Sequence, residues 1–326
     1  MGKVPVKGDL AMFYGDMPNN GSYDNGVWLD ILQVPFIQKI DEARDYNTVI
    51  RTLWIDASGW SKELRARYPE MVQIGLSDHP LSSHISRLPA DKQFDYITDL
   101  QYLNGLMALT EEERSWYASA VPSIPVIKVG LPFPVEKYTI KYSHLQDSKK
   151  EYVGLGVGAA DNDRNFISNL LIFRALRKEN PNLVGVFLSV PDKLMAYCTY
   201  MADHFDGVYI HKRESMDSYM EMLSRCKLVI SMTDRNSPGR VQGEAAFFKI
   251  PVVGSNRLEL QNELYPNYSW SPFDLEPAFE SARCILKDQV SADFYSQIAH
   301  DTLVANYDYV PSKKKFMDFL AKVRGD

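Results

Sequence analysis

The sequence predicts an α/β protein with two doubly wound, Rossmann-like domains. Strand-like apolar runs alternate with helix-like segments twice, over about 1–137 and 150–300. A polar and charged stretch, 137–151, separates the two series, and a helical tail follows the second. Such alternation is typical of parallel sheets that are covered by helices on both faces. We therefore expect a first domain over 1–143, a second over 144–326, and 137–151 as the linker between them.

Composition and charge fit a globular protein and argue against several classes. The 326 residues are 45% hydrophobic and 24% charged, and the net charge is −6. An acidic balance argues against a protein whose main task is to grip nucleic-acid phosphates. The three cysteines lack metal or disulfide spacing, which indicates a reducing compartment. No apolar signal core or run of ~20 apolar residues is visible. We expect a cytoplasmic protein without a membrane span, in the host cytoplasm if a phage encodes it.

The first half contains several apolar runs of strand length, which predict strands at 10–14, 49–55, 71–76, 94–100 and 106–109. A helix is expected from about 26 to 39, with Pro35 kinking or ending it. Thr110 is predicted to cap a helix whose first turn is acidic.

Two polar loops of the first half are candidate site segments, because ligands bind outside the carboxyl ends of the strands in this fold. Asp16 follows the first strand, and Asp78-His79 follows the third. A carboxylate beside an imidazole can remove a proton or hold sugar hydroxyls. The ordinary alternative is a turn whose Asp bonds its own backbone beside an exposed His.

The stretch 227–255 organises the second half, because it reads as a strand, a loop, a helix and a second strand. Ser237 suits the N-cap of that helix and Pro238 its first position. A helix N-terminus offers unpaired N–H groups and a positive dipole end, so it is a ready site for a diphosphate. Arg240 adds a charge there, and Glu244 lies one turn later on the same face. The alternative is an ordinary i,i+4 surface ion pair between these two side chains.

The order S-x-G-R-x-x-x-E-A-A-x-x-x-I-P-V-V-x-S, from Ser237 to Ser255, resembles the donor-binding segment of GT-B glycosyltransferases with a family-four-like donor domain. In that group the acidic residue holds the ribose of a nucleotide sugar, and the resemblance gives this role to Glu244. Many retaining members carry a second Glu at the position that is Asn236 here. The resemblance thus places a nucleotide beside Asn236, Ser237, Gly239 and Arg240.

Other loops add to this resemblance. Arg164, followed by Asn, looks like the element whose cation meets the diphosphate, and an Arg there suits bidentate pairing with phosphate oxygens. The loop of His211 and Arg213 corresponds to one that brackets the nucleobase; a solvated charge cluster is the alternative. GT-B enzymes often place a His, or an Asp that serves as base, in the loop of Asp78. The strand before it is similar, more loosely, to one in phage DNA base glucosyltransferases.

The resemblance implies a hexosyl- or pentosyltransferase that moves a sugar from a nucleotide diphosphate sugar, UDP-sugar first, to an acceptor hydroxyl. It implies two domains facing across a cleft, a last helix that returns to the first domain, and no required cofactor or metal. If the reaction inverts the sugar, Asp78 is the candidate base and Asp16 the reserve. If it retains the configuration, His79 and Asn236 would position the donor.

The sequence leaves the acceptor open. It is a glycan, a small molecule, or a hydroxymethylated base in phage DNA, which would make the protein a DNA-modifying enzyme. A non-catalytic nucleotide- or glycan-binding relative is the alternative from another class, because Asn236 replaces a Glu.

Overall fold

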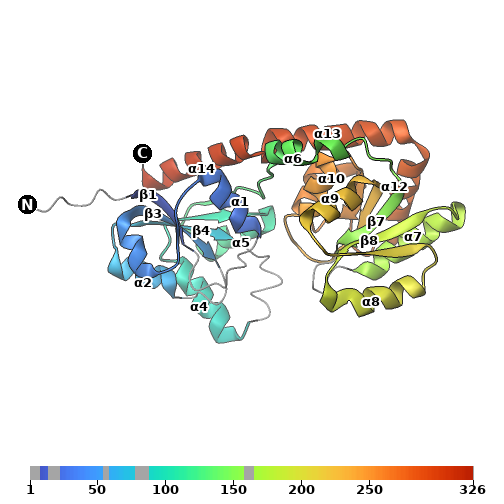
Figure 1. The fold of residues 1–326 in the computed structure, drawn as a ribbon. Coiled ribbons are helices and arrows are strands. Elements are labelled where there is room, and N and C mark those ends of the chain that lie inside the picture. Colours follow the sequence, from blue (N-terminus) through green and yellow to red (C-terminus); the bar gives the residue numbers. More distant parts are fainter. Residues whose placement is uncertain (1–7, 14–22, 54–58, 78–87, 158–164, 326) are drawn as a thin grey trace, which may run out of the picture. The chain divides into compact units, whose positions relative to one another are not determined.

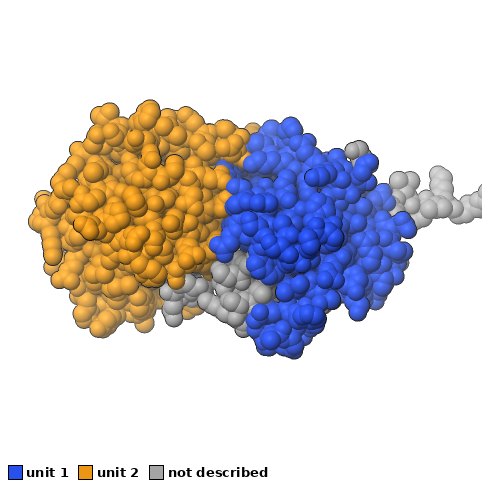
Figure 2. Space-filling model, turned by 180° about the vertical axis from the view of Figure 1, so that it is seen from behind, with its two compact units in different colours: residues 1–133, 307–326 blue, residues 134–306 orange. Residues whose placement is uncertain are grey.

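The computed structural model describes residues 8–13, 23–53, 59–77, 88–157 and 165–325. Contacts divide the chain into two compact units, which are coloured separately in Figure 2. The first unit comprises Met1–Phe133 and Tyr307–Asp326, and the second comprises Pro134–Asn306. The division falls after Phe133, whereas the sequence placed it after residue 143. Each unit contains one six-stranded parallel sheet, which confirms the α/β class with two doubly wound parts.

The sheet of the first unit has the order β2-β1-β3-β4-β5-β6. Its strands are β1 (Gly8–Phe13), β2 (Phe36–Ile37), β3 (Tyr46–Leu53), β4 (Val72–Ser77), β5 (Gly105–Ala108) and β6 (Val126–Lys128). Its helices are α1 (Tyr23–Leu32), the 3-10 helix η1 (Ile40–Asp45), α2 (Trp60–Arg67), α4 (Ala90–Leu100), α5 (Glu111–Ala120) and α14 (Tyr309–Arg324). The order reverses between β1 and β3.

Side chains of the first sheet alternate between two apolar cores, as the pleat of a strand requires. In β1, Met12 lies in the core that includes residues of α1 and α14, such as Trp28 and Phe316. Ala11 and Phe13, on the other face, pack with Leu64 of α2. Figure 1 shows α1 and α14 on one side of this sheet and α2 and α4 on the other. Both faces are therefore covered, which explains why the strands read as nearly continuous apolar runs.

Two predictions for the first unit are wrong. The segment 94–100 is the end of α4, not a strand. Its buried residues include Tyr96, Asp99 and Leu100, which have helical spacing and a mixed polar character. The helix expected from about 26 to 39, with Pro35 kinking or ending it, already ends at Leu32, and the residues after Pro35 form β2, which pairs with β1. Both errors concern short segments, in which a few apolar residues do not define a period.

The predicted cap at Thr110 is confirmed and creates a buried acid. Thr110 Oγ1 accepts a hydrogen bond from the Glu113 N–H (3.2 Å), and the Glu113 carboxylate accepts from the N–H groups of Thr110 (3.1 Å) and Leu109 (2.8 Å). Glu113 is only 3% exposed. Burial raises the pKa of Glu113 from 4.5 to about 7, although the backbone bond from Leu109 acts in the opposite direction.

We therefore expect the free energy of unfolding to fall by about 3 kcal/mol as the pH rises from 4.5 to about 7. In that range the folded chain keeps the proton of Glu113 and the unfolded chain has lost it, so raising the pH favours unfolding. Glu113→Gln, which stays neutral, should remove this slope and be more stable than the wild type at pH 8. Urea unfolding of both chains at several pH values measures the effect. An identical slope in both chains would contradict it.

The sheet of the second unit has the order β12-β11-β10-β7-β8-β9. Its strands are β7 (Tyr152–Val157), β8 (Val184–Val190), β9 (Val208–Lys212), β10 (Cys226–Ser231), β11 (Val252–Ser255) and β12 (Ser269–Trp270). Its helices are α6 (Val135–Tyr142), α7 (Phe166–Glu179), α8 (Asp192–Asp203), α9 (Met216–Ser224), α10 (Arg240–Phe247), α11 (Glu259–Leu264), α12 (Leu275–Lys287) and α13 (Gln289–Tyr307), with 3-10 turns η4 (Ser143–Leu145) and η6 (Pro266–Tyr268). The order reverses between β7 and β10.

The main core of the second unit lies between the sheet and the helices α7, α8 and α12. It joins strand residues such as Leu155 and Ile230 to Phe173 of α7, Leu194 of α8 and Ala282 of α12. The helices α9 and α10 lie on the opposite face from α8 (Figure 1). The helices α9 and α10, which contribute residues to the candidate site, therefore lie on the same side of the sheet.

The segment predicted to be a linker is helical instead. Within 137–151, the structure has most of α6 and the short turn η4. Val135, Tyr138 and Tyr142 are buried at helical spacing, and the Tyr138 ring lies 5.5 Å from the ring of Phe247 in α10. The prediction is wrong because polar and charged residues surround Tyr138 and Tyr142 in the sequence and obscure the apolar face of α6.

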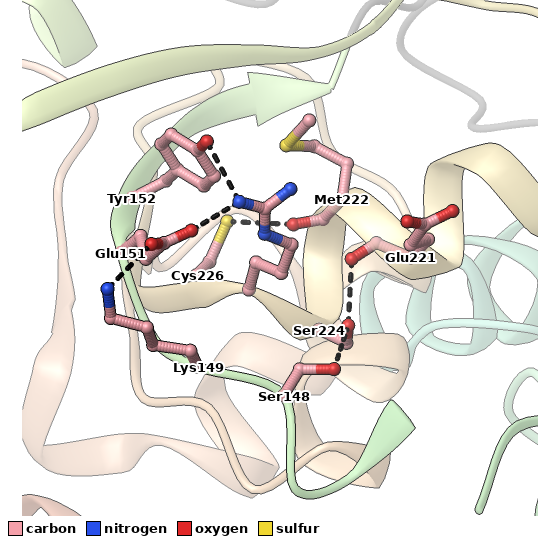
Figure 3. A network of polar contacts seen from close by, with 9 residues as sticks. Ser148, Lys149, Glu151, Tyr152, Glu221, Met222, Ser224 and Cys226 are labelled. Carbon is pink, nitrogen blue, oxygen red and sulfur yellow. Dashed lines mark hydrogen bonds and ion pairs between the residues drawn. The ribbon is translucent and has the colours of Figure 1, made fainter. Parts of the chain in front are cut away.

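The amino edge of the second sheet is held by polar contacts (Figure 3). Arg225, just before β10, pairs with Glu151 and donates to Tyr152 Oη (3.2 Å) at the start of β7. Ser224 Oγ lies 3.1 Å from Ser148 Oγ. These contacts fix the start of β7 against the start of β10, so the two strands also arrive at the opposite, carboxyl edge as a fixed pair.

The tail of the chain forms α12, α13 and α14, as the sequence predicted. Phe316 and Phe319 of α14 lie in the core of the first unit, and Arg324 donates to Thr48 Oγ1 in β3 (2.6 Å). The expected return of the last helix to the first domain is thus confirmed. None of the described helices is both long enough and apolar enough to cross a lipid bilayer.

Candidate functional site

The carboxyl ends of β7 and β10 mark the place where the second sheet reverses its order, and ligands of open α/β sheets bind outside such a point. Asn169 of α7 links these two ends. Its Oδ1 accepts a hydrogen bond from the N–H of Met232, just after β10 (2.8 Å). Its Nδ2 lies so close to Gly156, in β7, that a Cβ added to this glycine would be only 2.8 Å from it. Gly156 also has a φ of +72°, so this position favours glycine on two grounds. Asn169, only 1% exposed, therefore fixes the base of the site.

The helix after β10 begins later than the sequence predicted. Gly239, with a φ of 86°, is the N-cap of α10, and Arg240 is its first residue. Ser237 does not cap this helix, because its backbone pairs with the segment before α11 and its carbonyl accepts from the Glu259 N–H (3.1 Å). Pro238 consequently precedes the helix. The first N–H groups of α10 lack intrahelical acceptors, which keeps this end suited to an anion.

The carboxylate of Glu244 is held from two sides. Oε1 accepts from Arg240 Nε (2.7 Å), and Oε2 accepts from Tyr219 Oη (2.6 Å). The Glu244 side chain is 2% exposed and that of Arg240 is 31% exposed, so this is not an ordinary surface ion pair. A carboxylate offers about four acceptor sites, which leaves room for further hydrogen bonds. Arg240 is thus the more exposed partner of the pair, and Glu244 the buried one.

Tyr219 is the hydrogen-bond donor in its contact with Glu244. Burial raises the pKa of the Tyr219 hydroxyl well above its usual value, and the nearby Glu244 raises it further. The hydroxyl is therefore protonated at physiological pH, and the carboxylate is the acceptor.

His211 and Arg213 lie at and just beyond the end of β9. His211 Nε2 is 2.9 Å from Ser218 Oγ, and burial lowers the pKa of the imidazole, which favours its neutral form. Arg213 Nε donates to Ser189 Oγ (3.1 Å) near the end of β8. Ser189 has a φ of 55°, a conformation that is uncommon outside glycine. The ends of β8 and β9 are thus joined by side chains at the same carboxyl edge.

Helix α9 connects these residues to Glu244. Its first turns place Ser218 against His211, Met216 Sδ 3.4 Å from Arg240 Nη2, and Tyr219 against Glu244. Ser215 Oγ caps the helix by accepting from the Ser218 N–H (3.1 Å). Helix α9 therefore contacts residues at the end of β9 and residues of the helix that follows β10, although these two strands are not adjacent in the sheet.

The described candidates for nucleotide binding lie at the ends of strands at this edge or follow them in the chain: His211, Arg213, Asn236, Ser237, Gly239, Arg240 and Glu244. The remaining candidates, Asp16, Asp78, His79 and Arg164, lie outside the described residues. Their roles stay predictions.

Sequence reasoning missed Asn169 and Tyr219. Asn169 is a polar residue within the buried face of α7, between Phe166 and Phe173, and that position was a usable signal. Tyr219 gave none, because a Tyr on the apolar face of an amphipathic helix reads as core. Among the described residues, no group of His, Cys, Asp and Glu side chains has the arrangement of a metal site. The arrangement instead offers cations, helix N–H groups and one carboxylate, which suit a phosphorylated ligand with hydroxyl groups.

No protein-family model and no curated protein sequence matches this chain. Solved structures do match it. Anabaena HepE in complex with UDP is 11% identical over 96% of this chain and 99% of that chain, with a TM-score of 0.76. An E. coli structure described as trehalose-6-phosphate bound with UDP-2-fluoro glucose is 12% identical over 97% and 93%, with a TM-score of 0.72.

A third match is a variant of S. aureus TarM in complex with fondaparinux, α-GlcNAc-glycerol and UDP. It is 13% identical over 92% of this chain and 58% of that chain, with a TM-score of 0.67. At such identities the likeness concerns the fold alone, and it confirms the predicted GT-B fold.

Proposed function

We propose that the protein is a glycosyltransferase that takes a sugar from a UDP-sugar and places it on an acceptor hydroxyl. The observation that carries this proposal is the buried Glu244 carboxylate one turn from the N-terminus of α10, at the point where the second sheet reverses its order. UDP in the HepE complex and a UDP-sugar analogue in the E. coli complex, both on the same fold, support the choice of donor.

The nucleotide binds in this proposal by an exchange of partners. The diphosphate settles at the first turn of α10 and draws Arg240 away from Glu244, because a phosphate offers the guanidinium a bidentate partner of higher charge. Oε1 of Glu244, which accepts from Arg240 in this structure, then accepts from the ribose hydroxyls. The dipole of α10, Arg240 and Arg164 stabilise the charge that develops on the leaving diphosphate. His211 and Arg213 flank the base or the phosphates.

The acid–base groups of the transfer step are proposed from the sequence. Asp78 follows β4 in the chain and is the base if the sugar is inverted, with Asp16 in reserve. His79 and Asn236 position the donor if the configuration is retained. Neither role requires a metal ion.

A glycan or small molecule is the acceptor class that we favour. TarM was solved with fondaparinux and α-GlcNAc-glycerol, whereas the three neighbours described above give a modified DNA base no support. The net charge of −6 also argues against duplex DNA. Binding to duplex DNA that weakens steeply with salt would reopen the DNA alternative.

Nucleotide binding is the first test, and we expect UDP to raise the melting temperature more than GDP or ADP does. UDP at a hundred times its Kd adds about 2.7 kcal/mol to the free energy of unfolding, because it binds only the folded chain. A thermal-shift series with the three nucleotides measures this. Absence of a shift with all three would contradict the proposal. Tight UDP binding without any hydrolysis or transfer of UDP-sugars would favour the non-catalytic relative.

A further inference from the structure

Besides Arg240, Tyr219 donates a side-chain hydrogen bond to Glu244. The hydroxyl of Tyr219 lies 2.6 Å from Oε2, on the side of the carboxylate opposite to Arg240. Tyr219 itself is 6% exposed, so water competes little for this bond. The contact joins α9 to α10 and is independent of the Arg240–Glu244 pair within α10.

Arg240 and Tyr219, the two partners of Glu244, are expected to respond differently when a ligand binds. Arg240 is partly exposed and is the partner that a diphosphate displaces in the proposed exchange. Tyr219 is buried against α10 and carries no charge that a diphosphate attracts. Once Arg240 has moved, the Tyr219 hydroxyl remains as the donor that fixes the rotation of the carboxylate.

We propose that Tyr219 is a positioning residue for ribose recognition. It holds Oε2 of Glu244 so that Oε1 points to the ribose hydroxyls, which makes the site selective for ribonucleotides. This inference rests on the proposed function, since it assumes that Glu244 receives the ribose. It adds a residue that the sequence did not single out, and it assigns the selectivity to the α9–α10 contact.

The test compares two ligands that differ only at the ribose, UDP and 2′,3′-dideoxy-UDP, in calorimetric titrations of the wild type and of Tyr219→Phe. This substitution removes one hydroxyl and keeps the ring that packs against α10. A Glu244 carboxylate that is no longer held in place loses its hydrogen bonds to the ribose hydroxyls, so we expect UDP affinity to fall about tenfold or more. The affinity for 2′,3′-dideoxy-UDP should change by less than about twofold, because that ligand makes no bond to Glu244.

Tyr265→Phe is the matched control. Tyr265 is also buried in the second unit, and its hydroxyl donates to the Ile250 carbonyl (2.8 Å), a contact that involves no candidate site residue. It should lose stability of the same order as Tyr219→Phe and keep the UDP affinity of the wild type. Melting temperatures of both variants show that each is folded.

Three results would overturn the inference. Equal weakening of both ligands by Tyr219→Phe would show a general structural role, and unchanged UDP affinity would show no role. A wild type that binds UDP and 2′,3′-dideoxy-UDP equally well would show that Glu244 does not hold the ribose. A wild type that binds neither nucleotide contradicts the proposed function itself, so the two failures are distinguishable.

Discussion

Asp99→Ala is expected to lower the free energy of unfolding by about 4 kcal/mol, the largest effect on stability that we expect from a single substitution. Asp99 and Arg51 form an ion pair in the first unit whose side chains are 4% and 3% exposed. Removal of the carboxylate leaves the guanidinium buried without its counter-charge, which costs more than the pair contributes when intact.

The Asp99 carboxylate also joins three elements. It receives the Arg51 guanidinium from β3 and accepts from the Lys62 N–H in α2 (3.1 Å), while Asp99 itself belongs to α4. Ser61, on α2, is a further hydrogen-bond partner of Arg51. The substitution should therefore loosen the packing of both helices against the sheet in addition to exposing a charge to an apolar core.

Asp95→Ala is the control for this prediction. Asp95 lies one turn earlier in α4, and its partner Lys92 is 3.6 Å away with both side chains 55% exposed. Such a pair contributes little, so we expect a change within about 0.5 kcal/mol. Urea unfolding of both variants at pH 7 measures the difference. A loss below about 1 kcal/mol for Asp99→Ala would show that Arg51 finds another partner or reaches water.

The sequence was sufficient for the architecture because both sheets are parallel and buried. The strands β4 and β5, for example, were predicted within one residue, since each is an apolar run between clear turns. The elements that were predicted wrongly are either short and amphipathic, such as α6, or contain a buried charged residue, such as α4 with Asp99. A buried Asp reads as a surface residue until its partner on another element is known.

Only those features of the candidate site that arise within one helix could be predicted from the sequence. Helical spacing places Arg240 and Glu244 on the same face of one helix. The sequence left open whether they form a ligand site or an ordinary i,i+4 ion pair. The hydrogen bond from Tyr219 to Glu244 could not be predicted, because Tyr219 lies in the preceding helix, a strand and a loop before α10, and no periodicity connects the two residues. The cap at Ser237 was predicted wrongly, because its backbone pairs with the segment before α11, a contact between residues distant in sequence.

Glu244→Gln is expected to lower UDP affinity about a hundredfold, the largest effect on function that we expect. The amide keeps the size of the carboxylate, and it can accept from Arg240 while donating to the oxygen of Tyr219, so the fold should persist. It offers no charge to the ribose hydroxyls, and a lost hydrogen bond to a charged group costs roughly 1.5–3 kcal/mol. Glu113→Gln makes the same chemical change at a buried carboxyl in the first unit and should leave UDP affinity unchanged.

Calorimetric titration of UDP into the wild type, Glu244→Gln and Glu113→Gln tests the central claim most directly, namely that the Glu244 carboxylate receives the ribose. The account predicts binding by the wild type and by Glu113→Gln, and about a hundredfold weaker binding by Glu244→Gln. Equal UDP affinity of the wild type and Glu244→Gln would contradict it, because Glu244 would then be a buried structural partner of Arg240 and Tyr219 and nothing more.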